Sequence, residues 1–120
     1  MTVMKNTIEN ESFLFAVRIA KLCRYLQEEK KEYILSKQLL RAGTSIGANV
    51  AESQQAQSRA DFVSKLNIAL KEAVETNYWI RLLHAAEYLN MTECDSILSD
   101  CRELEKILTS ILKTSRDVSK

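Results

Sequence analysis

Apolar residues recur along most of the chain at steps of three and four, the spacing that places them on one face of an α-helix. Polar or charged segments interrupt this pattern at residues 28–32, at residues 54–57 and around Asn90. We expect Ser36 and Ser58 to cap the second and third helices and Asn90 to end the third. The pattern predicts four helices, over about residues 12–28, 36–53, 59–89 and 93–115.

The connections between these helices are short, which favours neighbours that run antiparallel. The chain has 120 residues, 46% of them hydrophobic, with no proline and two glycines. This composition supplies the core of one domain but serves sharp turns and sheet corners poorly. We therefore predict an all-α fold: a single domain over residues 1–120, built as an up-down-up-down four-helix bundle.

The second helix carries small residues at every fourth position. Gly43, Gly47 and Ala51 share one side of it, because residues four apart are neighbours on a helix surface. Each glycine costs roughly 1 kcal/mol relative to alanine inside a helix. Their presence predicts that a neighbouring helix packs so closely here that a Cβ would block it.

Polar residues form a stripe on the far side of the same helix, and two acids follow at a matching level of the third helix. The stripe has two interpretations: hydrogen bonds and ion pairs between helices, or a recognition surface anchored by Arg41. The set comprises Arg41, Ser45, Asn49, Glu52, Glu72 and Glu75.

Arg41 is the residue of this stripe whose partner can be predicted. The turn between the second and third helices centres near residue 56, so position 41 lies level with residue 71. Glu72 and Glu75 bracket that level, and the planar guanidinium can hold a carboxylate by two hydrogen bonds. We predict that Arg41 pairs with Glu72 or Glu75 in a structural role. The sequence leaves open whether the carboxylate belongs to the same chain or to a neighbouring subunit.

Several large apolar residues fall outside the predicted core stripes of the first and third helices. Contiguous apolar patches of this kind usually mark an interface. We therefore predict that the bundle self-associates through the apolar backs of these two helices. The candidate interface residues are Phe13, Leu14, Val17, Ile68, Trp79 and Leu82.

The formal net charge is +1, which is too small to indicate nucleic-acid binding by itself. Basic side chains could still contact phosphates, and such binding would be independent of sequence and sensitive to salt. The candidate nucleic-acid-binding residues are Arg18, Lys21, Arg24, Lys37, Arg59 and Lys65.

Few residues could support catalysis or hold a metal ion. His84 is the only histidine, so no histidine pair forms within a chain, and we expect it to be a packed side chain. Cys23, Cys94 and Cys101 lie at core-like positions and are interpreted as buried thiols. No Gly-rich phosphate loop or Cys-x-x-Cys motif is present. We expect a non-enzymatic protein without cofactor or metal, and, since no signal peptide or membrane span is evident, a cytoplasmic one.

The runs QLLRAGTSIGANVAES and FVSKLNIALKEAVETNYWIRLL, with the earlier SFLFAVRI, closely resemble a bacterial four-helix-bundle family encoded in 23S ribosomal RNA intervening sequences. The likeness covers about residues 10–112. It is most specific at these positions: Gln38, Arg41, Ser45, Ile46, Asn49, Ala51, Glu52, Phe62, Leu66, Ala69, Glu72 or Glu75, and Trp79.

This resemblance implies an up-down bundle that assembles as a closed homopentamer. The chain is also similar to the accessory proteins of diversity-generating retroelements, basic pentameric barrels that bind nucleic acid and a reverse transcriptase. The family has no established enzyme activity, and the resemblance implies no catalytic residue. The first hypothesis is therefore a non-catalytic oligomeric scaffold that contacts RNA or DNA weakly. The alternative is a protein-binding adaptor for a nucleic-acid enzyme, without nucleic-acid contact of its own.

Overall fold

The computed structural model describes the backbone of residues 2–119 and the side chains of residues 7–116. Every regular element in that part of the chain is a helix, which confirms the prediction of an all-α fold with four helices. The helices are α1 Thr2–Glu28, α2 Leu35–Ser53, α3 Arg59–Ala85 and α4 Met91–Ser119.

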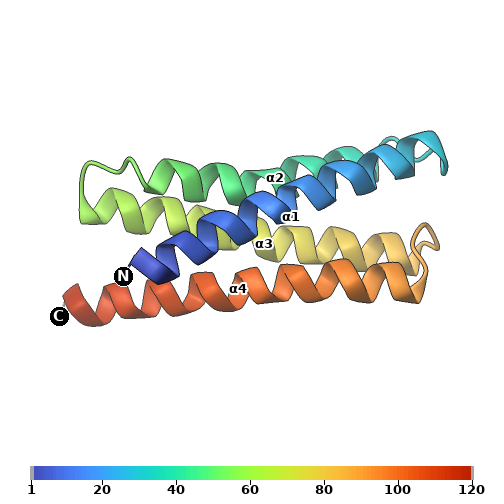
Figure 1. Cartoon of the computed structure of the whole chain (residues 1–120). Helices are drawn as coiled ribbons and strands as arrows, with labels where there is room; N and C mark the ends of the chain where they lie inside the picture. Colours follow the sequence, from blue (N-terminus) through green and yellow to red (C-terminus); the bar gives the residue numbers. More distant parts are fainter. Residues whose placement is uncertain (1, 120) are drawn as a thin grey trace.

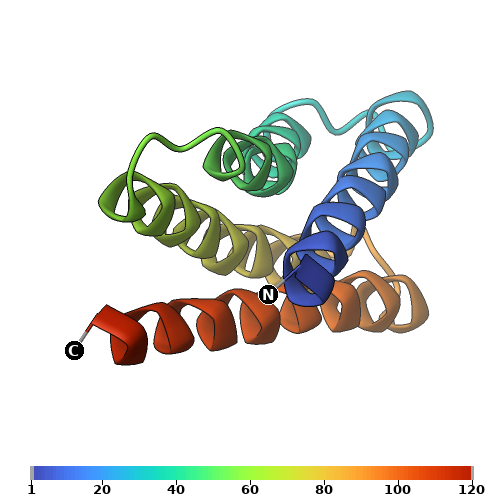
Figure 2. The same ribbon diagram turned by 60° about the vertical axis from the view of Figure 1, so that its left-hand side comes forward.

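The four helices form an elongated bundle, in which each packs on the next along the chain and α1 also packs on α4. The connections between consecutive helices alternate between the two ends of the bundle (Figure 1). Helix α1 crosses obliquely: its C-terminal end lies beside the start of α2, whereas its N-terminal end lies against α4 (Figures 1 and 2). Since α1 and α3 each pack on α2 and α4, they occupy opposite corners of the bundle.

The core contains aliphatic side chains from all four helices, with Phe15 on α1 as its buried aromatic ring. The three cysteines are free and buried, as predicted. Burial raises the pKa of Cys23 to about 12, with a further contribution from the charge of Glu32, and burial raises the pKa of Cys101 to about 12 beside Glu105. These thiols therefore stay protonated at neutral pH and pack as small apolar groups.

The two glycines of α2 pack against α1. A Cβ added at Gly43 would lie 2.8 Å from Cγ2 and 2.9 Å from Cγ1 of Ile19. A Cβ at Gly47 would lie 3.2 Å from the backbone oxygen of Ser12. The small residues thus permit the close helix contact that their spacing predicts.

The predicted start of the first helix is wrong by ten residues, because α1 begins at Thr2 and not near residue 12. Ile8, in the additional turns, is fully buried and continues the apolar face of α1. The fourth helix also begins earlier and ends later than predicted. Asn90 is its N-cap and not the C-cap of the third helix: its side chain accepts a hydrogen bond from the Glu93 N–H at 2.8 Å, and Glu93 accepts one from the Asn90 N–H at 2.9 Å. This reciprocal pair is a capping box.

The third helix ends at Ala85, four residues before the predicted boundary, in a Schellman motif. The N–H of Tyr88 donates to the Leu83 oxygen at 2.9 Å, and the N–H of Glu87 donates to the His84 oxygen at 2.9 Å. Glu87 adopts a left-handed conformation with φ of 71°, which glycine would take without steric cost. The N-cap predicted at Ser58 is confirmed, since its side chain accepts from the Asp61 N–H at 3.0 Å.

Glu32, and not Ser36, satisfies the start of α2. Its carboxylate accepts hydrogen bonds from the N–H groups of Ile34, Leu35 and Ser36 at 3.1, 2.9 and 2.7 Å. Burial alone would raise the pKa of Glu32, but these backbone donors outweigh it and hold the pKa below its ordinary value. The residue that appeared to belong to a charged connection is therefore a buried cap.

Candidate interaction surfaces

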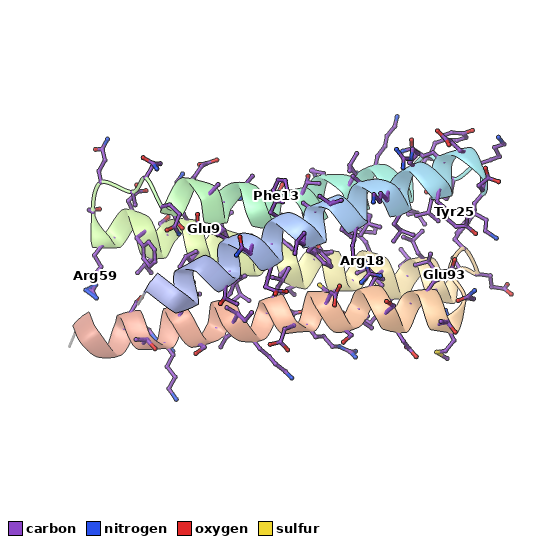
Figure 3. The ribbon with its side chains drawn as sticks, viewed as in Figure 1. Glu9, Phe13, Arg18, Tyr25, Arg59 and Glu93 are labelled. Atoms are coloured by element: carbon purple, nitrogen blue, oxygen red, sulfur yellow. The ribbon has the colours of Figure 1, made fainter. Side chains whose placement is uncertain are left out.

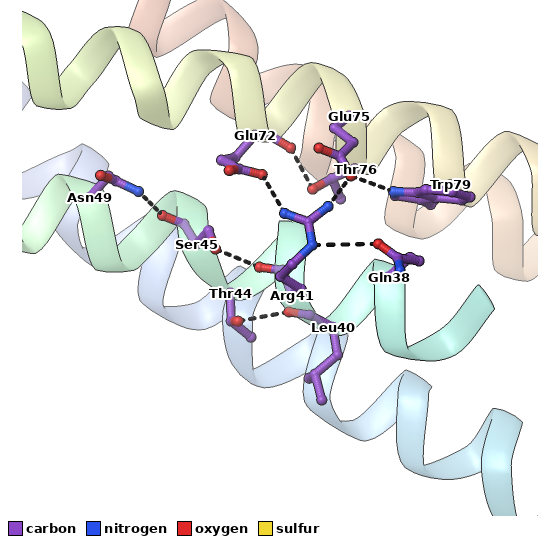
Figure 4. A network of polar contacts seen from close by, with 10 residues as sticks. All are labelled: Gln38, Leu40, Arg41, Thr44, Ser45, Asn49, Glu72, Glu75, Thr76 and Trp79. Carbon is purple, nitrogen blue, oxygen red and sulfur yellow. Dashed lines mark hydrogen bonds and ion pairs between the residues drawn. The ribbon is translucent and has the colours of Figure 1, made fainter. Parts of the chain in front are cut away.

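Arg41 is the centre of a polar cluster that joins α2 to α3 within one chain (Figure 4). Its guanidinium donates to Glu72 Oε1 at 3.3 Å and to Glu75 Oε2, and its Nε donates to Gln38 Oε1 at 3.5 Å. Trp79 Nε1 donates to the same Glu75 oxygen at 2.8 Å. Arg41 thus contacts both of the carboxylates that were predicted as alternative partners.

The other members of the stripe bond to their own helix or to a neighbouring charge. Ser45 Oγ donates to the Arg41 carbonyl at 2.6 Å, and Asn49 Nδ2 donates to the Ser45 carbonyl at 2.9 Å. Lys65 on α3 lies 3.2 Å from Glu52. Each of these polar groups has a partner in the chain, so the geometry favours the structural interpretation of the stripe.

The candidate nucleic-acid-binding residues do not share one face. Arg18 forms an ion pair with Asp100 on α4 at 2.5 Å and donates to Ser96 Oγ at 3.0 Å. Lys65 is paired with Glu52, as described above. Arg59 projects from the opposite end of the bundle to Tyr25 (Figure 3). Lys21 and Arg24 on α1 and Lys37 on α2 are exposed.

The candidate interface residues differ in their exposure. Phe13 and Leu14 on α1 are 67% and 60% exposed, and Ile68 on α3 is 37% exposed. Val17 and Leu82 are half-buried. Trp79 lies at the edge of the core, packs against it and hydrogen-bonds to Glu75. The expectation that Trp79 lies away from the core is therefore wrong.

Two exposed residues of α3 were not predicted from the sequence. Val74 is 53% exposed and Tyr78 is 50% exposed. They are four residues apart and so lie side by side on the outer face of α3. Their four-residue spacing indicates that they share one face of the helix. Because α3 carries apolar residues on several sides, the sequence pattern does not show which face is exposed.

A groove of about 380 Å³ lies between the N-terminal half of α1 and the C-terminal half of α2. Toward its N-terminus, α1 crosses obliquely toward α4 (Figure 2). Its floor consists of small side chains, Phe13 lies between the two helices (Figure 3), and Glu9 lies at its edge. The lining residues are Glu9, Ser12, Phe13, Ala16, Thr44, Gly47, Ala48, Val50 and Ala51.

His84 is half-buried at the end of α3, where its Nδ1 lies 2.9 Å from the Leu89 carbonyl oxygen. That contact ties the α3–α4 connection to the helix. In the part of the chain that the structure describes, no three histidine, cysteine or acidic side chains gather to hold a metal ion. Nor does any helix within residues 2–119 combine the length and apolarity needed to cross a membrane.

The comparisons with known proteins agree on a family. The model of the 23S rRNA-intervening sequence protein family matches residues 4–110. The chain is also similar to a crystal structure from Bacteroides thetaiotaomicron, described as a protein with unknown function from the S23 ribosomal protein family. The two are 54% identical with a TM-score of 0.91, over 92% of this chain and 98% of the other. No curated protein matches the chain.

Proposed function

Because the chain belongs to the 23S rRNA-intervening sequence protein family, and a solved relative has unknown function, we propose a function from the residues that this chain exposes on its surface. The protein is a non-catalytic scaffold that self-associates. The observation that carries this proposal is the exposure of Phe13 and Leu14, at 67% and 60%, in the middle of a long helix. Two adjacent large apolar side chains on a rigid element are costly to leave in water.

The proposed assembly is a closed ring of antiparallel up-down-up-down bundles. The exposed apolar residues of α1 and α3 lie at opposite corners of the bundle. A contact between unlike faces is head-to-tail, and repeated head-to-tail contacts produce a ring when the rotation closes. The number five comes from the family resemblance alone.

The test is the mass of the protein in solution. Sedimentation velocity at micromolar concentration should show the wild-type chain as an oligomer, and Leu14→Glu should shift it to monomer. Met91→Glu is a matched control, because Met91 is 61% exposed but lies at the start of α4, away from α1's middle. A monomeric wild-type protein would refute the scaffold.

The ligand that we propose for the scaffold is RNA or DNA, contacted weakly in the cytoplasm. Lys21, Arg24 and Lys37 are exposed and would be repeated around a ring, where weak sites add by multivalency. Filter binding with a structured RNA should show affinity that falls steeply with salt. Lys21→Glu with Arg24→Glu should abolish it, whereas the charge-neutral pair Asn67→Ser and Thr109→Ser should not.

The second candidate is an adaptor that binds a nucleic-acid enzyme and does not contact nucleic acid itself. The pairing of Arg18 with Asp100 and of Lys65 with Glu52 favours it, because two of the six basic candidates are already neutralised. An oligomer that fails to bind RNA or DNA at low ionic strength would support the adaptor over the nucleic-acid scaffold.

A further inference from the structure

The groove between α1 and α2 has the features of a docking surface. Its lining includes the exposed small residues Ala48 and Ala51, and Phe13 supplies one apolar wall. An apolar concavity with a few polar groups at its edge is the common form of a binding site in proteins. The role of this groove depends on which molecule occupies it.

The outer face of α3 carries a pair of exposed side chains that could enter such a groove. We define the ridge as Val74 and Tyr78, which are about half exposed. The Tyr78 ring is held in place: it contacts Trp79 edge to face with centroids 5.1 Å apart, and the Arg81 guanidinium lies 6.0 Å from its centroid. A side chain that is already ordered loses little conformational entropy when it docks.

The charges beside the groove and the ridge are also complementary. The groove has the carboxylate of Glu9 at its edge. Lys71 and Arg81 lie three residues before Val74 and three after Tyr78, on the same exposed face of α3. An apolar centre with opposite charges at its rim is the usual composition of a protein–protein interface.

We propose that the ridge of one copy of this chain occupies the α1/α2 groove of the next copy. The inference rests on the proposed self-association and names its two surfaces. It also replaces Trp79 and Leu82 by Val74 and Tyr78 as the α3 side of the contact. Since groove and ridge lie on different faces of one chain, each copy offers one of each, and the contact has a direction.

The first experiment changes the ridge alone. Tyr78→Arg should raise the dissociation constant of the oligomer about 30-fold or more, as expected for a central interface side chain. Tyr33→Arg is the matched control, because Tyr33 is also 50% exposed but lies in the connection between α1 and α2. Circular dichroism and a thermal melt check that both variants keep the wild-type fold.

The second experiment uses the direction of the contact. Ala48→Arg blocks the groove but leaves the ridge intact, whereas Tyr78→Arg blocks the ridge but leaves the groove intact. Each variant alone should sediment as a monomer, and an equimolar mixture should form a dimer with one working interface. An interface of two like faces would give no such rescue.

The outcomes separate this inference from the proposal on which it rests. If the wild-type chain is a monomer, the scaffold fails and the inference fails with it. If the wild-type chain is an oligomer but Tyr78→Arg keeps that mass, or the mixture of variants stays monomeric, the scaffold stands and the groove–ridge contact is wrong. A dimer formed only in the mixture supports the contact.

Discussion

Replacing Arg41 by alanine tests whether the polar cluster between α2 and α3 is structural. The change removes the donors to Glu72, Glu75 and Gln38 at once and leaves two carboxylates three residues apart on α3. A fully shielded pair would cost about 3 kcal/mol to break in this way. The cluster is less shielded than that, because the side chains of Arg41, Glu72 and Glu75 are 48%, 21% and 36% exposed.

Solvent screening therefore reduces the expected cost. Two partly exposed ion pairs contribute about 0.5 kcal/mol each, and the repulsion left between Glu72 and Glu75 adds about 0.3 kcal/mol. We expect Arg41→Ala to lower the free energy of unfolding by about 1 to 1.5 kcal/mol. For a domain of this size that corresponds to a decrease in Tm of about 3–6 °C.

The assay is a double-mutant cycle by urea denaturation with Arg41→Ala, Glu75→Gln and the double variant. Glutamine keeps an oxygen that can accept the hydrogen bond from Trp79 Nε1, so the cycle isolates the charge. We expect a coupling energy of about 0.5–1 kcal/mol that shrinks in high salt. Lys37→Ala, an exposed cation on the same helix, is the control and should change stability by less than about 0.5 kcal/mol.

One result would refute the structural role of Arg41. If Arg41→Ala melts and assembles as the wild type but no longer binds RNA, the ion pairs contribute nothing and the residue is a nucleic-acid anchor. Loss of stability together with unchanged RNA binding per folded oligomer would support the structural role.

Three further predictions concern the ends and the close contacts of the helices. Gly43→Ala should lower the unfolding free energy by about 1–2 kcal/mol in denaturant melts, because strain against Ile19 exceeds the gain in helix propensity; a more stable variant would show that α1 moves away at little cost. Glu32 has a lowered pKa, so its stabilising contribution is complete above the unfolded-state value of about 4.3 and is lost as pH falls through the lower folded pKa. Glu32→Gln should therefore destabilise at pH 7 and flatten the acid limb of stability against pH, and an unchanged limb would contradict the capping role. Glu87→Gly should raise Tm, with a gain of about 1 kcal/mol from relief of the left-handed conformation; a decrease would mean that the Glu87 side chain contributes more than its backbone strain costs.

The helices and their inward faces could be predicted because one physical signal controls them. Apolar residues at steps of three and four are buried in every helix, and the glycine spacing of α2 indicated a contact that the structure contains. The level of Arg41 opposite Glu72 and Glu75 follows from the same regularity, since two helices joined by a short turn rise at equal rates.

The remaining features depend on contacts that no local pattern shows. Glu32 looks like one charge among several in a connection, and only the folded chain brings three N–H groups to its carboxylate. Asn90 suits either end of a helix, and its partner Glu93 decides which. On α3, apolar residues occur on several sides of the helix. If the predicted buried face is shifted by one residue, Trp79 and not Tyr78 is predicted as the exposed ring.

The position of the Arg41 cluster also bears on where a second copy can dock. Arg41 pairs with Glu72 and Glu75 within one chain, and Lys65 pairs with Glu52 elsewhere between the same two helices. We call these ion pairs between α2 and α3 the seam. An interface built on the seam would have to break or bury these pairs, which costs desolvation. The groove lies between α1 and α2, and the ridge residues Val74 and Tyr78 are exposed on α3. The seam therefore holds α2 and α3 together, and the proposed self-association would use the groove and the ridge instead.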